Sequence, residues 1–177
     1  NGLNLHLGNG QFKRILHDPA NSQSIANNFV HDIIEDADGS LWLSIVEGGL
    51  NKLNTETLTA KRYLSDPKNQ NSISSNVVLK SVIDQEGNVW SATWGGGLNK
   101  FDGEKFTTFR HDPNKSSISN NNLEDVTVDR NGNIWTANYF GGVNKYSAEK
   151  IVNYFASDYV DEGLIPMDNV LKVFVDK

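Results

Sequence analysis

The sequence predicts an all-β protein, a β-propeller segment of four-stranded antiparallel blades with three complete repeats plus flanking strands. Three observations predict this fold. The motif Asp-x-x-Gly-x-x-Trp occurs three times, its tryptophans are 48 and 45 residues apart, and no segment shows a sustained 3.6-residue period. We therefore expect one partial propeller over residues 1–177, with repeats at about 29–64, 77–110 and 122–155 and half-blades at 1–16 and 169–177.

The first strand of each repeat is an apolar stretch that ends at the aspartate of the motif. These stretches cover residues 30–36, 78–84 and 123–129. The aspartate side chain is suited to accept hydrogen bonds from the turn backbone, and a glycine supplies the positive φ that a tight turn needs. We assign this structural role to Gly39, Gly87 and Gly132.

The second strand carries the repeated tryptophan, and we assign it to the scaffold. Trp42, Trp90 and Trp135 recur at one strand position, where large rings fill the space between adjacent blades. Truncating one of these rings should cost about 3–5 kcal/mol. A glycine pair follows each second strand, and it joins two strands instead of opening a helix, so a tight turn explains it better than a phosphate cradle does. The third strand and a fourth strand, at 61–64 and 105–110, complete the blade.

The two ends of the chain are out of phase with whole blades. Residues 2–4 match the middle of a third strand, and residues 170–176 match a first strand. Closed propellers usually need at least about four blades, so we expect the chain to be an excerpt of a larger protein. A ring closed by its own termini and a ring completed by a second copy are the alternatives. An unclosed sheet edge would favour self-association.

Composition excludes several classes of partner and cofactor. The net charge is −6 and no Lys- or Arg-rich block is present, which argues against binding of nucleic acid. No stretch of 18 apolar residues occurs, so we expect no membrane contact within this segment. The absence of cysteine excludes disulfides and thiolate metal sites. His17 and His111 occupy equivalent loops, but Ser65 replaces them in the second repeat, so we expect no metal site and no cofactor.

The repeat resembles a known family. Its motifs follow one another in the order Asp-x-x-Gly-x-Ile/Leu/Val-Trp, Gly-Gly-Leu-Asn-Lys-Phe, and His-Asp-Pro with Ser-Ile-Ser-Asn-Asn. In these motifs it is similar to the two-component regulator propeller repeat. The resemblance covers almost the whole chain. It implies an extracytoplasmic, periplasmic sensor region of a bacterial hybrid histidine kinase or diguanylate-cyclase receptor, and family members with a known input tend to sense glycans.

The candidate ligand site lies in the turns between the second and third strands. In a four-stranded meander these turns share one end of the blade with the loop that enters the next blade. Their variable positions hold Glu47, Trp94, and the pair Tyr139 and Phe140. Exposed aromatic rings in neighbouring turns suit stacking on sugar rings or gripping a peptide. The alternative is that these rings pack on the long loops.

The first strand, nearest the propeller axis, carries a second set of candidates. His31 and Glu124 would reach a ligand at the mouth. One position later the charge alternates in sign, at Asp32, Lys80, Asp125 and Lys172. We interpret these charges as interblade ion pairs rather than as a charged binding floor.

Three functions remain open from sequence. The leading hypothesis is a non-enzymatic sensing module for a small molecule or oligosaccharide, with its signalling output domain outside this chain. A propeller lyase or glycan-degrading enzyme is the second, since fold alone does not exclude chemistry; no catalytic motif supports it. A protein–protein interaction scaffold is the third, and it is compatible with sensing.

Overall fold

The computed structural model describes residues 2–147, 150–155 and 169–176, and the regular structure in this part of the chain is entirely β. Its strands form one two-stranded hairpin and three four-stranded antiparallel sheets. Every strand of a four-stranded sheet pairs with the strand next to it in the sequence. This meander is the architecture of a propeller blade, and the predicted fold class is confirmed.

The strands follow the predicted repeats closely. The hairpin consists of β1 (Leu3–Gly8) and β2 (Gln11–Ile15). The first complete blade consists of β3 (Val30–Glu35), β4 (Leu41–Ile45), β5 (Gly49–Leu53) and β6 (Ala60–Tyr63). The second consists of β7 (Val78–Ile83), β8 (Val89–Thr93), β9 (Gly97–Phe101) and β10 (Phe106–Phe109). The third consists of β11 (Leu123–Val128), β12 (Ile134–Asn138), β13 (Val143–Ser147) and β14 (Lys150–Tyr154).

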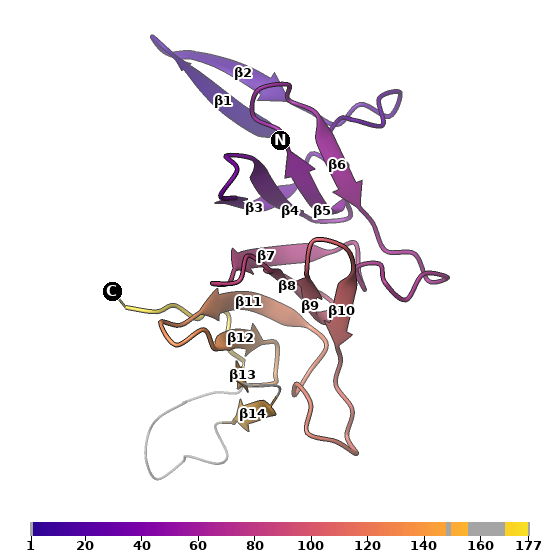
Figure 1. Cartoon of the computed structure of the whole chain (residues 1–177), viewed down its shortest axis with the longest axis vertical. Helices are drawn as coiled ribbons and strands as arrows, with labels where there is room; N and C mark the ends of the chain where they lie inside the picture. Colours follow the sequence, from indigo (N-terminus) through magenta and orange to yellow (C-terminus); the bar gives the residue numbers. More distant parts are fainter. Residues whose placement is uncertain (1, 148–149, 156–168, 177) are drawn as a thin grey trace.

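The blades are arranged in chain order along the long axis of the molecule (Figure 1). Their first strands are neighbours, with β7 packed between β3 and β11. The β1–β2 hairpin lies at one end of this row, and residues 169–176 lie beside β11. The described parts of the two ends are therefore separated by the three complete blades.

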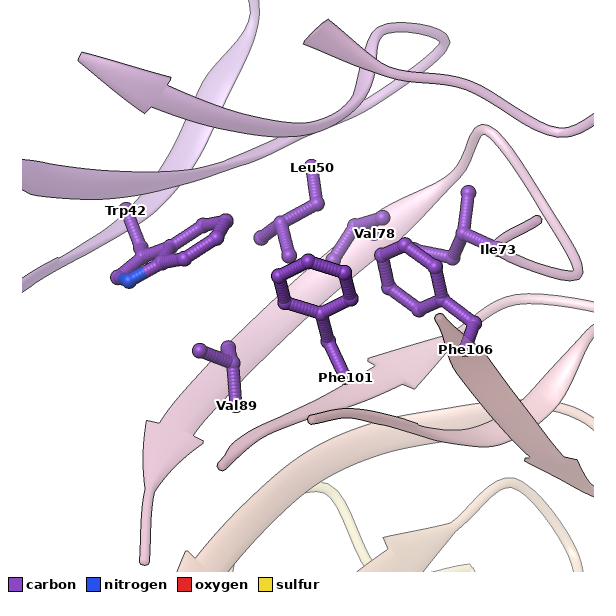
Figure 2. Packing of buried hydrophobic residues seen from close by; sticks show 7 residues of the cluster. All are labelled: Trp42, Leu50, Ile73, Val78, Val89, Phe101 and Phe106. Carbon is purple, nitrogen blue, oxygen red and sulfur yellow. The ribbon is translucent and has the colours of Figure 1, made fainter. Parts of the chain in front are cut away.

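The hydrophobic core lies between blades, and the repeated tryptophan is at its centre. Trp42 of the first blade contacts Phe101 of the second, with ring centroids 5.7 Å apart. Figure 2 shows these two rings among the aliphatic side chains contributed by both blades. Trp90 makes the same contact with Tyr146 of the third blade, at 5.2 Å. Trp42 and Trp90 are only 3% and 2% exposed, so both rings lie buried between adjacent blades, where the scaffold role was predicted.

Trp135 occupies the same position in the third blade but is only half-buried. It stacks on Tyr154 of its own blade, with centroids 5.7 Å apart. On its other side lies an apolar hollow of about 400 Å³, bounded by Val173, Phe174 and Val175. Within the described residues no ring from a following blade covers Trp135, which explains its greater exposure.

The aspartate of the repeated motif has a role that the sequence interpretation missed. Besides the turn backbone, it accepts a hydrogen bond from the indole of the tryptophan six residues later. The Trp Nε1 to Asp Oδ2 distances are 2.9, 2.7 and 2.9 Å for the pairs Asp36–Trp42, Asp84–Trp90 and Asp129–Trp135. A lysine ammonium then lies over each indole ring, about 5 Å from its centroid. The motif therefore fixes the orientation of the interblade ring.

These hydrogen bonds shift the pKa of the aspartates. Partial burial acts to raise the pKa of Asp129, but hydrogen bonds from the Trp135 indole and from the side chain and backbone of Asn133 lower it to about 2. The pKa of Asp84 is lowered in the same way, against the effect of burial, by Trp90 and Asn88. Both carboxylates thus remain charged acceptors throughout the physiological range.

The segment at 169–176 departs from prediction. The pattern predicts a first strand at 170–176, yet these residues form no strand in the structure. In each complete blade the first strand pairs with the second strand of its own blade, and this segment has no such partner within the described residues. It is held instead by single bonds, including one from the Val173 N–H to Asp125. Residue 177, the last of the predicted half-blade, lies outside the described residues.

Candidate functional site

The candidate site is built at the end of the blades where the second strand turns into the third. Strand register pairs Val78 with Thr93 and Leu123 with Asn138, so each first strand begins beside this turn. The turn is also bonded to the loop that enters the blade: the Trp94 N–H donates to Val77 and the Tyr139 N–H donates to Asn122. The Gly48 and Gly97 N–H groups, at the turns of the first and second blades, donate to Asn76 and Asn121 in the loop that enters the next blade, so the predicted topology is present.

Three of the predicted aromatic residues form one cluster across two blades. The ring centroids of Trp94 and Tyr139 are 5.2 Å apart, and those of Tyr139 and Phe140 are 4.5 Å apart. Trp94 is 38% exposed and Phe140 63% exposed, with Tyr139 half-buried between them. The rings therefore pack on one another and leave an aromatic surface open to solvent. We call Trp94, Tyr139 and Phe140 the aromatic cluster.

The loops support this cluster through its backbone. Ser75 Oγ donates to the Trp94 carbonyl at 2.9 Å, and Asn120 Nδ2 donates to the Tyr139 carbonyl at 2.8 Å. Arg110 donates to the carbonyl of Gly95 at 3.3 Å. The sequence interpretation did not assign these residues to the site. Ser75 and Asn120 each stand two residues after the loop isoleucine, Ile73 or Ile118, and this shared placement was the signal available.

A left-handed backbone conformation recurs at the second variable position of each turn. It is occupied by Glu47 with φ 57°, Gly95 with φ 76° and Phe140 with φ 50°. A non-glycine residue in this region costs about 1–3 kcal/mol, and such residues are enriched at binding sites. The turn thus projects the side chains of Glu47 and Phe140 in a fixed direction. Glu47 is exposed and lies in the turn of the first blade, apart from the aromatic cluster of the second and third blades.

His31 and Glu124 lie elsewhere, on the axial side of the blades. Both border a hollow of about 240 Å³ formed by the first strands and residues 171–172. His31 is exposed, and its Nδ1 lies 2.7 Å from the carbonyl oxygen of Leu79 on the next blade. Because a carbonyl only accepts hydrogen bonds, Nδ1 carries the proton and Nε2 is left for another partner. The six candidates therefore divide into the aromatic cluster, an axial pair and the separate Glu47.

The charged residues of the first strands behave as interblade contacts at the first interface. Lys80 Nζ lies 2.8 Å from Asp32 Oδ1, and the Ser81 N–H donates to Asp32 Oδ2 at 3.3 Å. The equivalent Asp125 is 4% exposed and accepts the N–H of Val173 at 3.0 Å. The predicted ion pair is confirmed for Asp32 and Lys80. For Asp125 the interblade partner is a backbone amide.

The two loop histidines make equivalent contacts. His17 and His111 each place Nδ1 2.9 Å from a loop carbonyl, that of Ile25 or Ile118, which accounts for their recurrence as loop residues. Over residues 2–147, 150–155 and 169–176, no three His, Cys, Asp or Glu side chains gather as metal ligands. No helix long and apolar enough to cross a bilayer occurs in the same residues.

The blades and their turns define the molecule as a segment of a β-propeller. Residues 24–45, which run from the long loop through β4, match the family model described as two component regulator propeller. Residues 24–45 therefore carry a repeat of the two-component regulator propeller type, and the resemblance seen in the sequence is confirmed for this segment.

Solved structures agree on the fold. The extracellular domain of a putative hybrid two component system from B. thetaiotaomicron superposes with a TM-score of 0.72 at 23% identity, over 82% of this chain and 20% of that chain. A catalytically inactive virginiamycin B lyase from Staphylococcus aureus superposes at 0.58 and 13% identity, over 82% and 45%. An ancestral GH74 enzyme superposes at 0.54 and 12% identity, over 75% and 19%. This chain thus spans about a fifth of the length of the first of these proteins. No curated protein matches the sequence.

Proposed function

We propose that this propeller segment is a non-enzymatic, ligand-sensing module of a bacterial transmembrane signalling receptor, located in the periplasm. The aromatic cluster is the observation that carries the proposal. It offers two exposed rings held by a third, and it joins two blades, so a ligand bound there contacts both. The match of residues 24–45 to the two component regulator propeller model supports the signalling context.

The chemistry of the cluster favours a glycan. Flat aromatic faces stack on the apolar faces of sugar rings, and nearby polar groups then fix the hydroxyls. Trp94 and Phe140 provide the faces, and Arg110, bonded to the Gly95 carbonyl in the Trp94 turn, provides N–H donors beside them. A binding role fits these groups better than catalysis does, since the axial His31 and Glu124 are separate from the rings.

Thermal unfolding in the presence of an oligosaccharide panel tests this proposal. A ligand that binds only the folded state raises Tm, with about 2.7 kcal/mol of stabilisation at a hundredfold excess over its Kd. We expect one or more oligosaccharides to raise Tm for the native chain but not for Trp94→Ala. Phe12→Ala is the matched control, because Phe12 is 62% exposed on β2, in the N-terminal hairpin.

The outcomes separate the functions that remained open from sequence. A shift that survives in Trp94→Ala would place the site away from the cluster. An absence of any shift across the panel would contradict glycan sensing, and a mass that rises with protein concentration, unaffected by sugars, would support self-association as the main role. Turnover of an oligosaccharide that is lost in Glu124→Gln would favour the enzymatic alternative.

A further inference from the structure

The long loop that enters each blade is built on the same plan in all three repeats. It begins at Asp18, Asp66 or Asp112, and a serine hydroxyl bonds back to the carbonyl of that aspartate. An asparagine of the third strand, Asn51, Asn99 or Asn144, then accepts an N–H from the far side of the loop. The loops can therefore be compared position by position.

In two repeats a side chain of the fourth strand donates a hydrogen bond to a serine carbonyl inside this loop. Arg62 Nε donates to the Ser24 carbonyl at 2.8 Å, and its Nη2 donates to the Asn21 carbonyl at 2.8 Å. Asn153 Nδ2 donates to the equivalent carbonyl of Ser117 at 3.0 Å. The register of the third and fourth strands places both residues opposite the third-strand asparagine that the repeats share.

The second repeat lacks this side chain. Its fourth strand has Thr108 opposite Asn99, and the Thr108 hydroxyl donates to Asn99 Oδ1 at 3.1 Å rather than into the loop. No donor from the described residues reaches the Ser72 carbonyl, which is equivalent to those of Ser24 and Ser117. A hollow of about 340 Å³ lies beside this carbonyl, and both Thr108 and Ser72 border it. The loop of the third repeat borders a hollow of about 580 Å³ as well, but there the equivalent Ser117 carbonyl already accepts a hydrogen bond from Asn153.

Charge decides which donor suits the hollow. The loop filled by arginine contains no lysine or arginine, whereas the loop filled by neutral Asn153 contains Lys115. The loop of the second repeat contains Lys68, and Arg110 also borders its hollow. Asp66 borders the same hollow, so its carboxylate and the Arg110 guanidinium leave the lining with no net charge, and a neutral donor is favoured over a second guanidinium.

We infer that the hollow between Thr108 and Ser72 is a binding site for a neutral primary carboxamide, which donates to the Ser72 carbonyl as Asn153 does to Ser117. The carboxamide is carried either by a free small molecule or by an asparagine or glutamine of a peptide. This site lies between the loop at residues 65–74 and the outer strand of the blade, and it contains none of the rings of the aromatic cluster, although Arg110 borders it and also bonds to the Gly95 carbonyl in the Trp94 turn.

The test is a titration followed by backbone amide NMR shifts, with free glutamine in one arm and the blocked peptide acetyl-Ala-Gln-Ala-amide in the other. We expect shifts confined to residues 65–74 and 108–110 in the native chain. The arm that gives the larger shifts identifies the source of the carboxamide. Thr108→Asn should abolish these shifts, because the introduced amide donates to the Ser72 carbonyl as Asn153 does to Ser117, and it should raise Tm.

Two further variants keep the result decisive. Arg62→Thr should create the same hollow in the first repeat and add shifts at residues 18–25, whereas Trp94→Ala should leave the binding unchanged. Shifts of equal size in Thr108→Asn and the native chain would overturn the inference, as would no shift in either arm. Retention of the native response in Trp94→Ala distinguishes this site from the one proposed for glycans.

Discussion

Two glycines of the second blade allow the role of close strand packing to be separated from the role of backbone conformation. Gly87 has φ +84° and Gly97 has φ +80°, so an alanine at either position would be destabilised by the left-handed backbone conformation. This cost is about 1 kcal/mol. A Cβ at position 87 would meet no atom within 4 Å, whereas a Cβ at position 97 would fall well inside van der Waals contact with the Phe109 carbonyl oxygen.

The second cost applies to Gly97 alone. Phe109 pairs with Leu98 at the end of β10, so relief of the contact requires the fourth strand to move away from the third. Overpacking of this kind adds about 1–3 kcal/mol. We expect Gly87→Ala to lower the free energy of unfolding by about 1 kcal/mol and Gly97→Ala by about 3 kcal/mol.

Urea unfolding followed by tryptophan fluorescence measures both values, provided that the m-value is unchanged. Trp90 lies on β8 of the same blade and reports on its packing. Equal destabilisation of the two variants would refute the reasoning, because it would show that the close approach of Gly97 to the fourth strand has no energetic consequence.

Three further predictions follow from individual contacts. The pKa of Asp129 is lowered to about 2 from an ordinary value near 3.8, so its stabilising effect is complete above pH 4 and lost as pH falls toward 2. Over this pH range the free energy of unfolding should fall by about 1–2 kcal/mol less for Asp129→Asn than for the native chain, as measured by acid unfolding. An equal fall in the two proteins would contradict the assignment. Glu47→Gly should raise Tm by relieving a positive φ, about 1 kcal/mol in stability; a lower Tm would show that the side chain compensates. Lys80→Ala should cost about 1 kcal/mol in urea unfolding, because Asp32 is left largely buried without its ion pair, and an unchanged midpoint would indicate compensation by the Ser81 N–H.

The fold could be predicted from the sequence because the motif that identifies each strand or turn occurs in all three repeats. Asp36, Asp84 and Asp129 mark the turn after each first strand, and the tryptophan six residues later marks the second strand. The bond between these two side chains was not predicted, since a turn explains the aspartate without it. The strand at 170–176 was predicted wrongly because a pattern reports the identity of a strand but not the presence of its hydrogen-bonded partner.

The site was predicted less completely, for a related reason. Trp94 and Tyr139 were selected as variable positions in equivalent turns, and the blade-to-blade geometry that brings their rings to 5.2 Å is a tertiary property. His31 and Glu124 were selected as a second set because the first strand lies nearest the propeller axis. The structure places both on the hollow formed by the first strands, and their reach to a ligand at the mouth stays a prediction.

The repeat itself separates structural positions from functional ones. Where all three copies agree, as at the interblade tryptophan, a single packing requirement explains the residue without any ligand. Where one copy departs, that requirement is absent or is met by another group. At the position of Trp94 the three copies have Val46, Trp94 and Tyr139, and at the position of Thr108 they have Arg62, Thr108 and Asn153. The first set adds exposed rings at neighbouring turns, and the second leaves the Ser72 carbonyl without a donor from the described residues. Both changes leave accessible groups at the second blade, so this blade, together with the third-blade rings of the aromatic cluster, is where we expect this segment to meet its ligands.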